Sequence, residues 1–215
     1  MCKHIFKNGT VCERNPRLKE YCGFHAPENH EDRYTNTRFL KNLKVLLKNE
    51  DGDWRGFKFP SHIDARDVNI DVHLDVSEAV FDNVRLNQVE FRKKIHALNL
   101  LVRGRLDLSS VTVSADLRLE GSIFSGECQF RFLIVEGKLV LSESVFQSGF
   151  VLSGRLRYSN FNGCDFQGAT KFRKDHKFTG TGSGTLGSVN IRAFGEISTP
   201  NFPFFVRLKN HVIRF

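Results

Sequence analysis

The 215-residue chain is predicted to be mainly β, with short strands that wind into a coil, one bridging helix and a small metal-binding module at the N-terminus. Three observations predict this organisation. Apolar residues recur with a mean spacing of about 5.5 residues between 106 and 166, which is neither a helical period nor a simple strand period. Cysteine and histidine are concentrated in the first 30 residues, and a helical stripe occurs at 35–52.

Composition and charge narrow the class of protein. The chain has 21 Phe against 3 Tyr and 1 Trp, and this bias towards a ring without a polar group indicates a repeated, dry interior. The net charge is +8, with a basic excess in residues 1–50 and 171–215 and a slight acidic excess in 51–170. We therefore expect any attraction to nucleic acid to reside at the two ends.

No feature of the sequence predicts a membrane span or a signal peptide. The sequence has no run of 18 apolar residues, so no membrane span is expected. The stretch MCKHIFKNGT lacks the apolar region of a signal peptide. These features favour a cytoplasmic protein with reduced thiols, and the odd count of five cysteines also argues against a disulfide framework.

Residues 1–30 are predicted to form a metal-binding module. Cys22 and His25 have the C-x2-H spacing that lets two side chains reach one tetrahedral ion, and Cys2 and Cys12 can complete a Cys3His set. The segment has too few large apolar side chains to bury a core, whereas structural zinc stabilises finger peptides by roughly 10–16 kcal/mol. The alternative is that the three cysteines are unrelated reduced thiols.

The stretch C…NGTVC…YCGFH resembles a short zinc-binding module found at the ends of some phage and bacterial proteins. In that module a Gly-x-x-Cys turn and a Tyr-Cys-x-x-His end supply the ligands. The resemblance implies structural zinc held by Cys2, Cys12, Cys22 and His25, with His4 as the alternative to one of them. A closed set of four ligands leaves no open position for catalysis.

Residues 35–52 are predicted to form an amphipathic helix that links the module to the rest of the chain. Asn36 or Thr37 is expected to cap its start, and Gly52 to end it. This helix could pack on its own domain with a solvated basic face, or bind an acidic partner or a phosphate backbone. The basic candidates for partner binding are Arg38, Lys41, Lys44 and Lys48.

Residues 67–77 alternate strictly between apolar and polar side chains and are predicted to form one strand. Val68, Ile70 and Leu74 are among the residues expected on its buried face. The other face carries Asp71 and His73, and is interpreted either as a solvated surface or as a cation or acid–base site.

A repeat begins next. Residues 79–93 divide into fives, AVFDN VRLNQ VEFRK, and residues 159–168 do so again, SNFNG CDFQG. The central residue of each five is Phe or Leu, and a smaller residue stands two positions before it. Between these blocks the spacing widens to five to seven residues. Such a pattern is typical of short sides joined by corners, each side pointing residues into a coil.

These blocks resemble the pentapeptide-repeat family, whose members coil into a right-handed β-helix with four sides of about five residues each. The resemblance extends loosely over residues 79–172 and implies a right-handed β-helix domain within 60–178. The departure at 95–158 implies longer or bulged sides there. Cys128 and Cys164 would be buried, inert thiols, and an antiparallel sandwich is the alternative fold.

Residues 179–215 comprise a Gly-rich loop and an aromatic, basic terminus. The glycine spacing at 182–187 matches a dinucleotide fingerprint, but no helical pattern follows it, so a loop is expected. The terminus is predicted either to cap the coil or to dock another protein or a second copy, giving a homo-oligomer. Its candidate contact residues are Phe204, Phe205, Arg207 and Lys209.

The sequence contains no nucleophile–base motif and no credible phosphate loop, and repeat folds provide long binding surfaces. We therefore expect a non-enzymatic interaction module that binds a protein or a protein–nucleic-acid complex. One branch of the pentapeptide-repeat family mimics DNA and binds type II topoisomerases, which is the first alternative. A β-helix enzyme is the second alternative.

Overall fold

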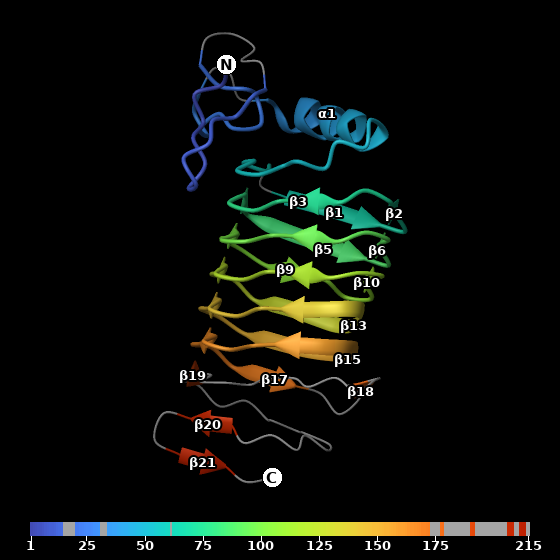
Figure 1. Cartoon of the computed structure of the whole chain (residues 1–215), viewed down its shortest axis with the longest axis vertical. Coiled ribbons are helices and arrows are strands. Elements are labelled where there is room, and N and C mark those ends of the chain that lie inside the picture. Colours follow the sequence, from blue (N-terminus) through green and yellow to red (C-terminus); the bar gives the residue numbers. More distant parts are fainter. Residues whose placement is uncertain are drawn as a thin grey trace.

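The computed structural model describes residues 1–14, 20–30, 34–60 and 62–172, and the backbone of short strands at 177–178, 190–191, 206–208 and 211–213. Figure 1 shows a stack of β rungs with the N-terminal module and helix α1 at one end. The fold is mainly β, a solenoid of about five turns. The expected fold class is therefore confirmed.

The solenoid has four sides, each a column of parallel strands. The first column contains β1 (His62–Arg66), β5 (Asn83–Asn87), β9 (Leu106–Asp107), the starts of β13 (Cys128–Val140) and β15 (Phe150–Asn160), and β17 (Thr170–Phe172). The second contains β2 (Asn69–Ile70), β6 (Glu90–Phe91), β10 (Thr112–Val113), the middle of β13 and β15, and β18 (Lys177–Phe178).

The third column contains β3 (Leu74–Asp75), β7 (Ile95–His96), β11 (Leu117–Arg118) and the ends of β13 and β15. The fourth contains β4 (Val80–Phe81), β8 (Leu101–Val102), β12 (Ile123–Phe124), β14 (Val145–Phe146), β16 (Asp165–Phe166) and β19 (Asn190–Ile191). All these pairs are parallel, so the antiparallel sandwich was wrong. Only β20 (Val206–Leu208) and β21 (His211–Ile213) pair antiparallel among the described strands.

The usual turn is longer than the four fives of the family pattern. Val84 pairs with Leu106, Leu106 with Cys128, and Cys128 with Phe150, so equivalent residues lie 22 apart. The first inward residues of successive sides stand at 84, 89, 95, 100 and 106, so steps of five and six alternate. The longer sides expected at 95–158 are therefore present, and bulges interrupt the register between β13 and β15.

Alternate corners of the coil use the left-handed backbone conformation. Gln88, Asn99, Ser110, Gly121 and Phe132 all have positive φ, between 52° and 64°, and they follow one another at intervals of eleven residues. Each lies between the first and second sides or between the third and fourth sides. Two such corners divide the 22-residue turn into two halves of equal length.

The fourth side carries a ladder of phenylalanine rings in the interior. Phe124 stacks on Phe146 with ring centroids 4.8 Å apart, and Phe146 stacks on Phe166 at 4.7 Å. All three rings are buried. Stacking of equivalent residues in successive turns therefore produces the dry interior that the composition predicts.

Small polar residues form a parallel column beside this ladder. The Ser122 hydroxyl donates to the Ala97 carbonyl at 3.0 Å, and the Cys164 thiol donates to the Leu141 carbonyl at 2.9 Å. Cys164 and Cys128 are buried, and burial raises the pKa of both thiols, that of Cys164 to about 12. The prediction that these two thiols are buried is confirmed, and a raised pKa disfavours the reactive thiolate.

Residues 67–77 do not form the single strand that their alternation predicts. Asp67 has a φ of 52° and occupies a corner, and the chain then makes two separate strands, β2 and β3, on different sides of the coil. Ile70 and Leu74 both point inward because each short side turns its own residues to the interior. The alternation of apolar and polar residues in the sequence therefore reflects two short strands on different sides of the coil, joined by a corner.

Helix α1 (Asn36–Lys48) covers the N-terminal end of the solenoid. Its N-cap is Thr35, whose side chain accepts a hydrogen bond from the Arg38 amide, in place of the expected Asn36 or Thr37. The helix ends at Lys48, before Gly52. Within the described part of the chain, no helix is long and apolar enough to span a membrane.

The coil already begins in residues 51–59. Asp53 and Lys58 bridge in parallel to Asp75 and Val80 of the next turn. The Trp54 amide donates to the Asp75 carbonyl at 2.8 Å, and the Phe59 amide donates to the Val80 carbonyl at 2.9 Å. This partial rung joins α1 to the solenoid and provides the surface on which the N-terminal module rests.

Candidate metal centre

A tight hairpin brings the first two cysteines of the module together. Ile5 and Val11 form an antiparallel bridge, and Gly9 takes a φ of 82° in the turn between them. The Asn8 side-chain oxygen accepts from the Thr10 amide at 3.0 Å, which fixes the expected Asn-Gly turn.

A second turn presents the other two candidate ligands. The His25 amide donates to the Cys22 carbonyl at 3.0 Å, so the chain folds back within the C-x2-H segment. Gly23 lies against the Tyr34 ring, where a Cβ would come within 2.3 Å of ring carbons. A larger residue would therefore displace the turn from the body of the module.

The four side chains converge on one point. The sulfur atoms of Cys2, Cys12 and Cys22 and a ring nitrogen of His25 all lie within 4.8 Å of one another, and all four residues are buried. The Cys22 sulfur is 3.1 Å from His25 Nδ1, and the Cys2 sulfur is 3.7 Å from it. All five cysteines are free of disulfides. The expectation that these residues come together is confirmed, and three thiols with one imidazole suit a tetrahedral metal ion.

The thiols of this cluster are not independent acids. A hydrogen bond with Cys22 lowers the pKa of the Cys12 thiol to about 4, and the same hydrogen bond raises the pKa of Cys22. The hydrogen bond between the two buried sulfurs therefore favours a thiolate at Cys12 and a thiol at Cys22. A bound cation would displace the proton of that thiol, because metals bind thiolates rather than thiols.

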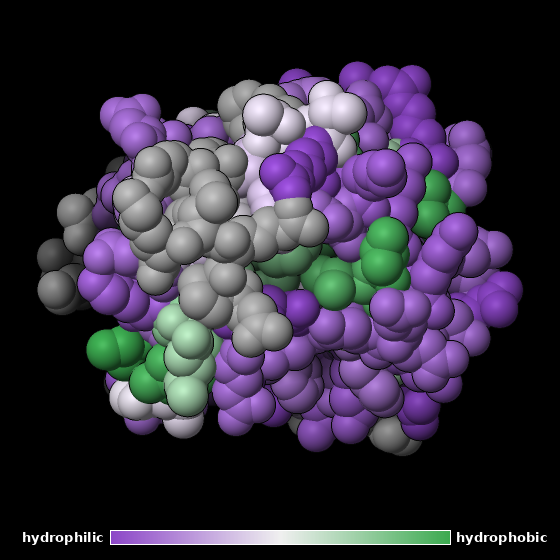
Figure 2. Space-filling view, turned by 90° about the horizontal axis from the view of Figure 1, so that it is seen from above, coloured by the Kyte–Doolittle hydropathy of each residue, from purple (hydrophilic) through white to green (hydrophobic). Residues whose placement is uncertain are grey.

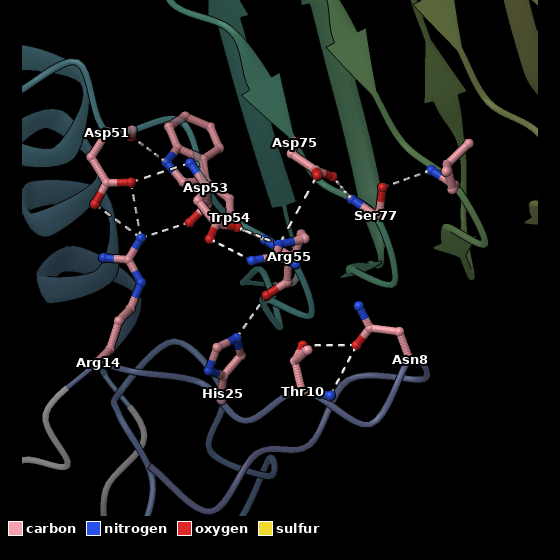
Figure 3. A network of polar contacts seen from close by, with 11 residues as sticks. Asn8, Thr10, Arg14, His25, Asp51, Asp53, Trp54, Arg55, Asp75 and Ser77 are labelled. Carbon is pink, nitrogen blue, oxygen red and sulfur yellow. Dashed lines mark hydrogen bonds and ion pairs between the residues drawn. The ribbon is translucent and has the colours of Figure 1, made fainter. Parts of the chain in front are cut away.

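The His25 ring is oriented from outside the cluster (Figure 3). Its Nε2 lies 2.7 Å from the main-chain carbonyl of Arg55, which can only accept a hydrogen bond. The Arg55 guanidinium pairs with the Asp53 carboxylate at 2.8 Å and lies over the Phe6 ring. The first rung of the solenoid therefore sets the orientation of a candidate ligand, as an outer-shell partner commonly does.

His4, the alternative ligand, lies next to the cluster without joining it. Its ring stacks on that of His25 with centroids 4.1 Å apart and planes 14° from parallel. Burial, followed by the influence of His25, lowers the pKa of His4 to about 4. The side chains whose ligand atoms converge are Cys2, Cys12, Cys22 and His25, so the structure favours this set over one that includes His4.

Packing joins the cluster to the helix and the first rung. Phe24, between two candidate ligands, stacks on Phe57 at 4.3 Å and meets Phe39 of α1 edge-on at 5.0 Å. Arg14 pairs with the Asp51 carboxylate at 3.0 Å and donates to the Asp53 carbonyl at 2.6 Å (Figure 3). Three parts of the chain that are separate in sequence therefore meet at this centre.

The residues proposed for partner binding are not brought into this site. Arg38, Lys41, Lys44 and Lys48 are exposed on α1. Phe204, Phe205 and Lys209 lie outside the described residues, as does the Gly-rich segment at 182–187, and only the backbone of Arg207 is described, in β20. Their roles stay predictions.

Sequence reasoning missed Arg55 and Arg14. The contribution of Arg55 to His25 is a main-chain carbonyl, which has no sequence signature, and Arg14 gave no signal because its partners lie 37 and 39 residues further along the chain.

No protein-family model matches this chain, and comparisons with curated proteins and with solved structures find no match.

Proposed function

We propose that Cys2, Cys12, Cys22 and His25 hold one structural zinc ion. The observation that supports this is the burial of four soft and borderline donors within 4.8 Å of one another, in a segment with little hydrophobic core. A Cys3His set is typical of structural zinc, and its four protein ligands leave no position for substrate. The ion would stabilise the junction between the module, α1 and the first rung.

We further propose that the chain is a non-enzymatic interaction module, a β-helix rod that binds its partner through α1. Phe39 on the inner face of this helix is only 2% exposed, whereas Arg38, Lys41, Lys44 and Lys48 face solvent. Among the described residues, Lys41, Lys44 and Lys48 make no ion pair. Unpaired charges held on a rigid support favour association with an acidic surface of a protein or a protein–nucleic-acid complex.

Charge reversal tests this proposal. The triple variant Lys41→Glu, Lys44→Glu, Lys48→Glu should lose binding to an acidic partner, whether duplex DNA, single-stranded RNA or an acidic protein. The matched control reverses Lys94, Lys138 and Lys171, which are exposed on the solenoid and change the net charge equally. Equal losses in both variants would indicate a general charge effect and contradict a binding face on α1.

The experiments with duplex DNA and single-stranded RNA also measure how the affinity depends on salt concentration. If phosphates are contacted, the affinity for duplex DNA should fall with salt by a logarithmic slope of about 0.9 per phosphate. If the chain binds the acidic protein but neither nucleic acid, the partner of α1 is a protein.

DNA mimicry is supported less well. Such a role requires a strongly negative surface, but acidic groups on the sides of the coil are paired along the strand with arginines two residues away. These pairs include Arg92 with Glu90, Arg105 with Asp107 and Arg118 with Glu120. The enzyme alternative stays a hypothesis.

A further inference from the structure

The interior of the solenoid contains a cavity near its N-terminal end. Its volume is about 460 Å³, and its lining runs from α1 through successive turns to Leu117 and Leu119. The lining is almost entirely aliphatic and aromatic, with Lys44 and Asp64 as its only charged residues. The volume lies within the range of roughly 300–1,000 Å³ that ligand pockets occupy.

The phenylalanine ladder is interrupted where it passes this cavity. On the fourth side, Phe59 stacks on Phe81 at 4.0 Å, and Phe124 begins the lower ladder. Between them stands Val102, which pairs with Phe81 on one side and Phe124 on the other. Valine is smaller than phenylalanine, so this position adds space to a cavity that Val102 lines.

The exposure of the inward-facing residues decreases along the coil, from the N-terminal turns to the C-terminal ones. On the first side, the inward Ala65 and Leu86 are partly exposed, whereas the equivalent Leu108, Phe130 and Leu152 are buried. The core is therefore closely packed at the C-terminal turns and open at the N-terminal ones. Close packing is the rule in protein interiors, so an apolar space of this size gives room for an apolar ligand.

The open end of the cavity lies beneath α1. Leu40, Leu43 and Leu47 of the helix line it together with Ile63 and Val68 of the first turn. Leu40 is 39% exposed and Val68 is 37% exposed, so the apolar lining continues to the surface. Figure 2 looks down on this end and shows apolar side chains among hydrophilic ones.

Asp64 and Lys44, the two charged residues of the lining, differ in whether their charge is compensated by an ion pair. The Asp64 carboxylate pairs with Arg66 at 3.2 Å, so its charge is compensated. Lys44 makes no ion pair among the described residues and is exposed. An uncompensated cation at the rim of an apolar cavity suits an amphiphile with an anionic head group.

We propose that this cavity binds the hydrocarbon chain of a fatty acid, which enters beneath α1 and leaves its carboxylate at Lys44. The chain lies along the aliphatic lining, which includes Val102, and the ammonium group compensates the charge of the head group. This site lies inside the solenoid and is separate from the metal centre and from the proposed contacts of α1 with an acidic partner, apart from Lys44 itself.

Titration of the full-length protein with saturated fatty acids of increasing length tests the proposal. Affinity should rise with chain length until the cavity is filled, and the acids should raise the melting temperature, because a ligand that binds only the folded state stabilises it. Val102→Phe should weaken binding at least tenfold by completing the ladder, and without ligand it should melt at a higher temperature than the wild type.

Matched variants separate the cavity from general effects. Ile123→Phe adds a larger side chain at an exposed position of the next turn, and it should leave binding unchanged. Ala97→Leu, at a second lining residue, replaces Val102→Phe if the latter does not fold. Lys44→Glu should weaken the binding of the acid but not of the corresponding alcohol, and Lys138→Glu should affect neither.

The opposite results would overturn the proposal. These are the absence of fatty-acid binding by folded wild-type protein, or an affinity that neither Val102→Phe nor Ala97→Leu reduces. Equal effects of Lys44→Glu on acid and alcohol would refute the assignment of the head group. Fatty-acid binding by a wild-type protein that binds none of the acidic partners would indicate that only the function proposed for α1 had failed.

Discussion

The Nε2 atom of His25 lies 2.7 Å from the main-chain carbonyl oxygen of Arg55. Since a carbonyl only accepts, the proton of the neutral imidazole resides on Nε2, and Nδ1 presents its lone pair to the three sulfurs. A residue of the solenoid thereby selects the tautomer that a metal requires. The candidate metal centre and the first rung of the solenoid are joined by this contact, and loss of one is expected to weaken the other.

Loss of a single ligand should release the metal. Protein purified without added metal is expected to contain about one equivalent of zinc, and Cys22→Ser should lower this to near zero and destabilise the N-terminal module. Elemental analysis and thermal melting measure both effects.

Cys164→Ser is the matched control for this prediction. Cys164 occupies the column that holds Ser122 and Ser144, so serine should be tolerated there and the zinc content should be unchanged. An ordered module without metal in the wild-type protein would contradict the assignment.

The sequence predicted the centre because its ligands are clustered in a segment without a core. Four residues within the first 25 sufficed to identify the set, and the Asn8–Gly9 turn explained how the chain reverses. The orientation of His25 could not be predicted, because it depends on a carbonyl 30 residues away. Contacts made by the main chain carry no residue preference, and only the fold reveals them.

Phenylalanines of the ladder should be major contributors to stability. Phe146→Ala removes a ring stacked on both sides, between Phe124 and Phe166, and should cost about 3–5 kcal/mol of unfolding free energy. Chemical denaturation measures this change.

An exposed phenylalanine serves as the control. Phe132 is 58% exposed at a corner, so Phe132→Ala should change stability by no more than about 0.5 kcal/mol. If both variants lost the same stability, the ladder would not be the interior of the coil.

Two glycines of the fifth turn should differ sharply in their tolerance of alanine. Gly154 has a φ of 131°, and a Cβ there would lie 2.0 Å from the Leu133 carbonyl oxygen. Gly154→Ala should therefore destabilise the protein by at least about 2 kcal/mol. Thermal and denaturant melting provide the measurement.

Gly149 is the reference position for this comparison. A Cβ there meets its neighbours at 3.5 Å, an ordinary contact, so Gly149→Ala should stay within about 1 kcal/mol of the wild type. Similar losses at both positions would show that the corner at 154 is not restricted in the way described.

The coil was predicted from its spacing, but the length of its turn was not. Residues 79–93 and 159–168 read as fives, and this reading concealed the sixth residue that alternate sides contain between the two blocks. The last turn does have the 20 residues of four fives, since Phe146 pairs with Phe166 and Phe150 with Thr170. The left-handed corners carry Gln88, Asn99, Ser110 and Phe132, which give no common turn signal. The first rung at 51–59 was missed because its few residues follow directly on the end of α1.

The recurrence of left-handed corners every eleven residues restricts how such a chain can change its length. Inserting or deleting one complete circuit, such as residues 106–127, keeps every later residue on its own side and preserves both the ring ladder and the serine column. Inserting or deleting half a circuit also preserves the corners but rotates all later sides by two places. The rod can therefore be lengthened in units of either size, while the alignment of its surface with the N-terminal module survives only in whole circuits.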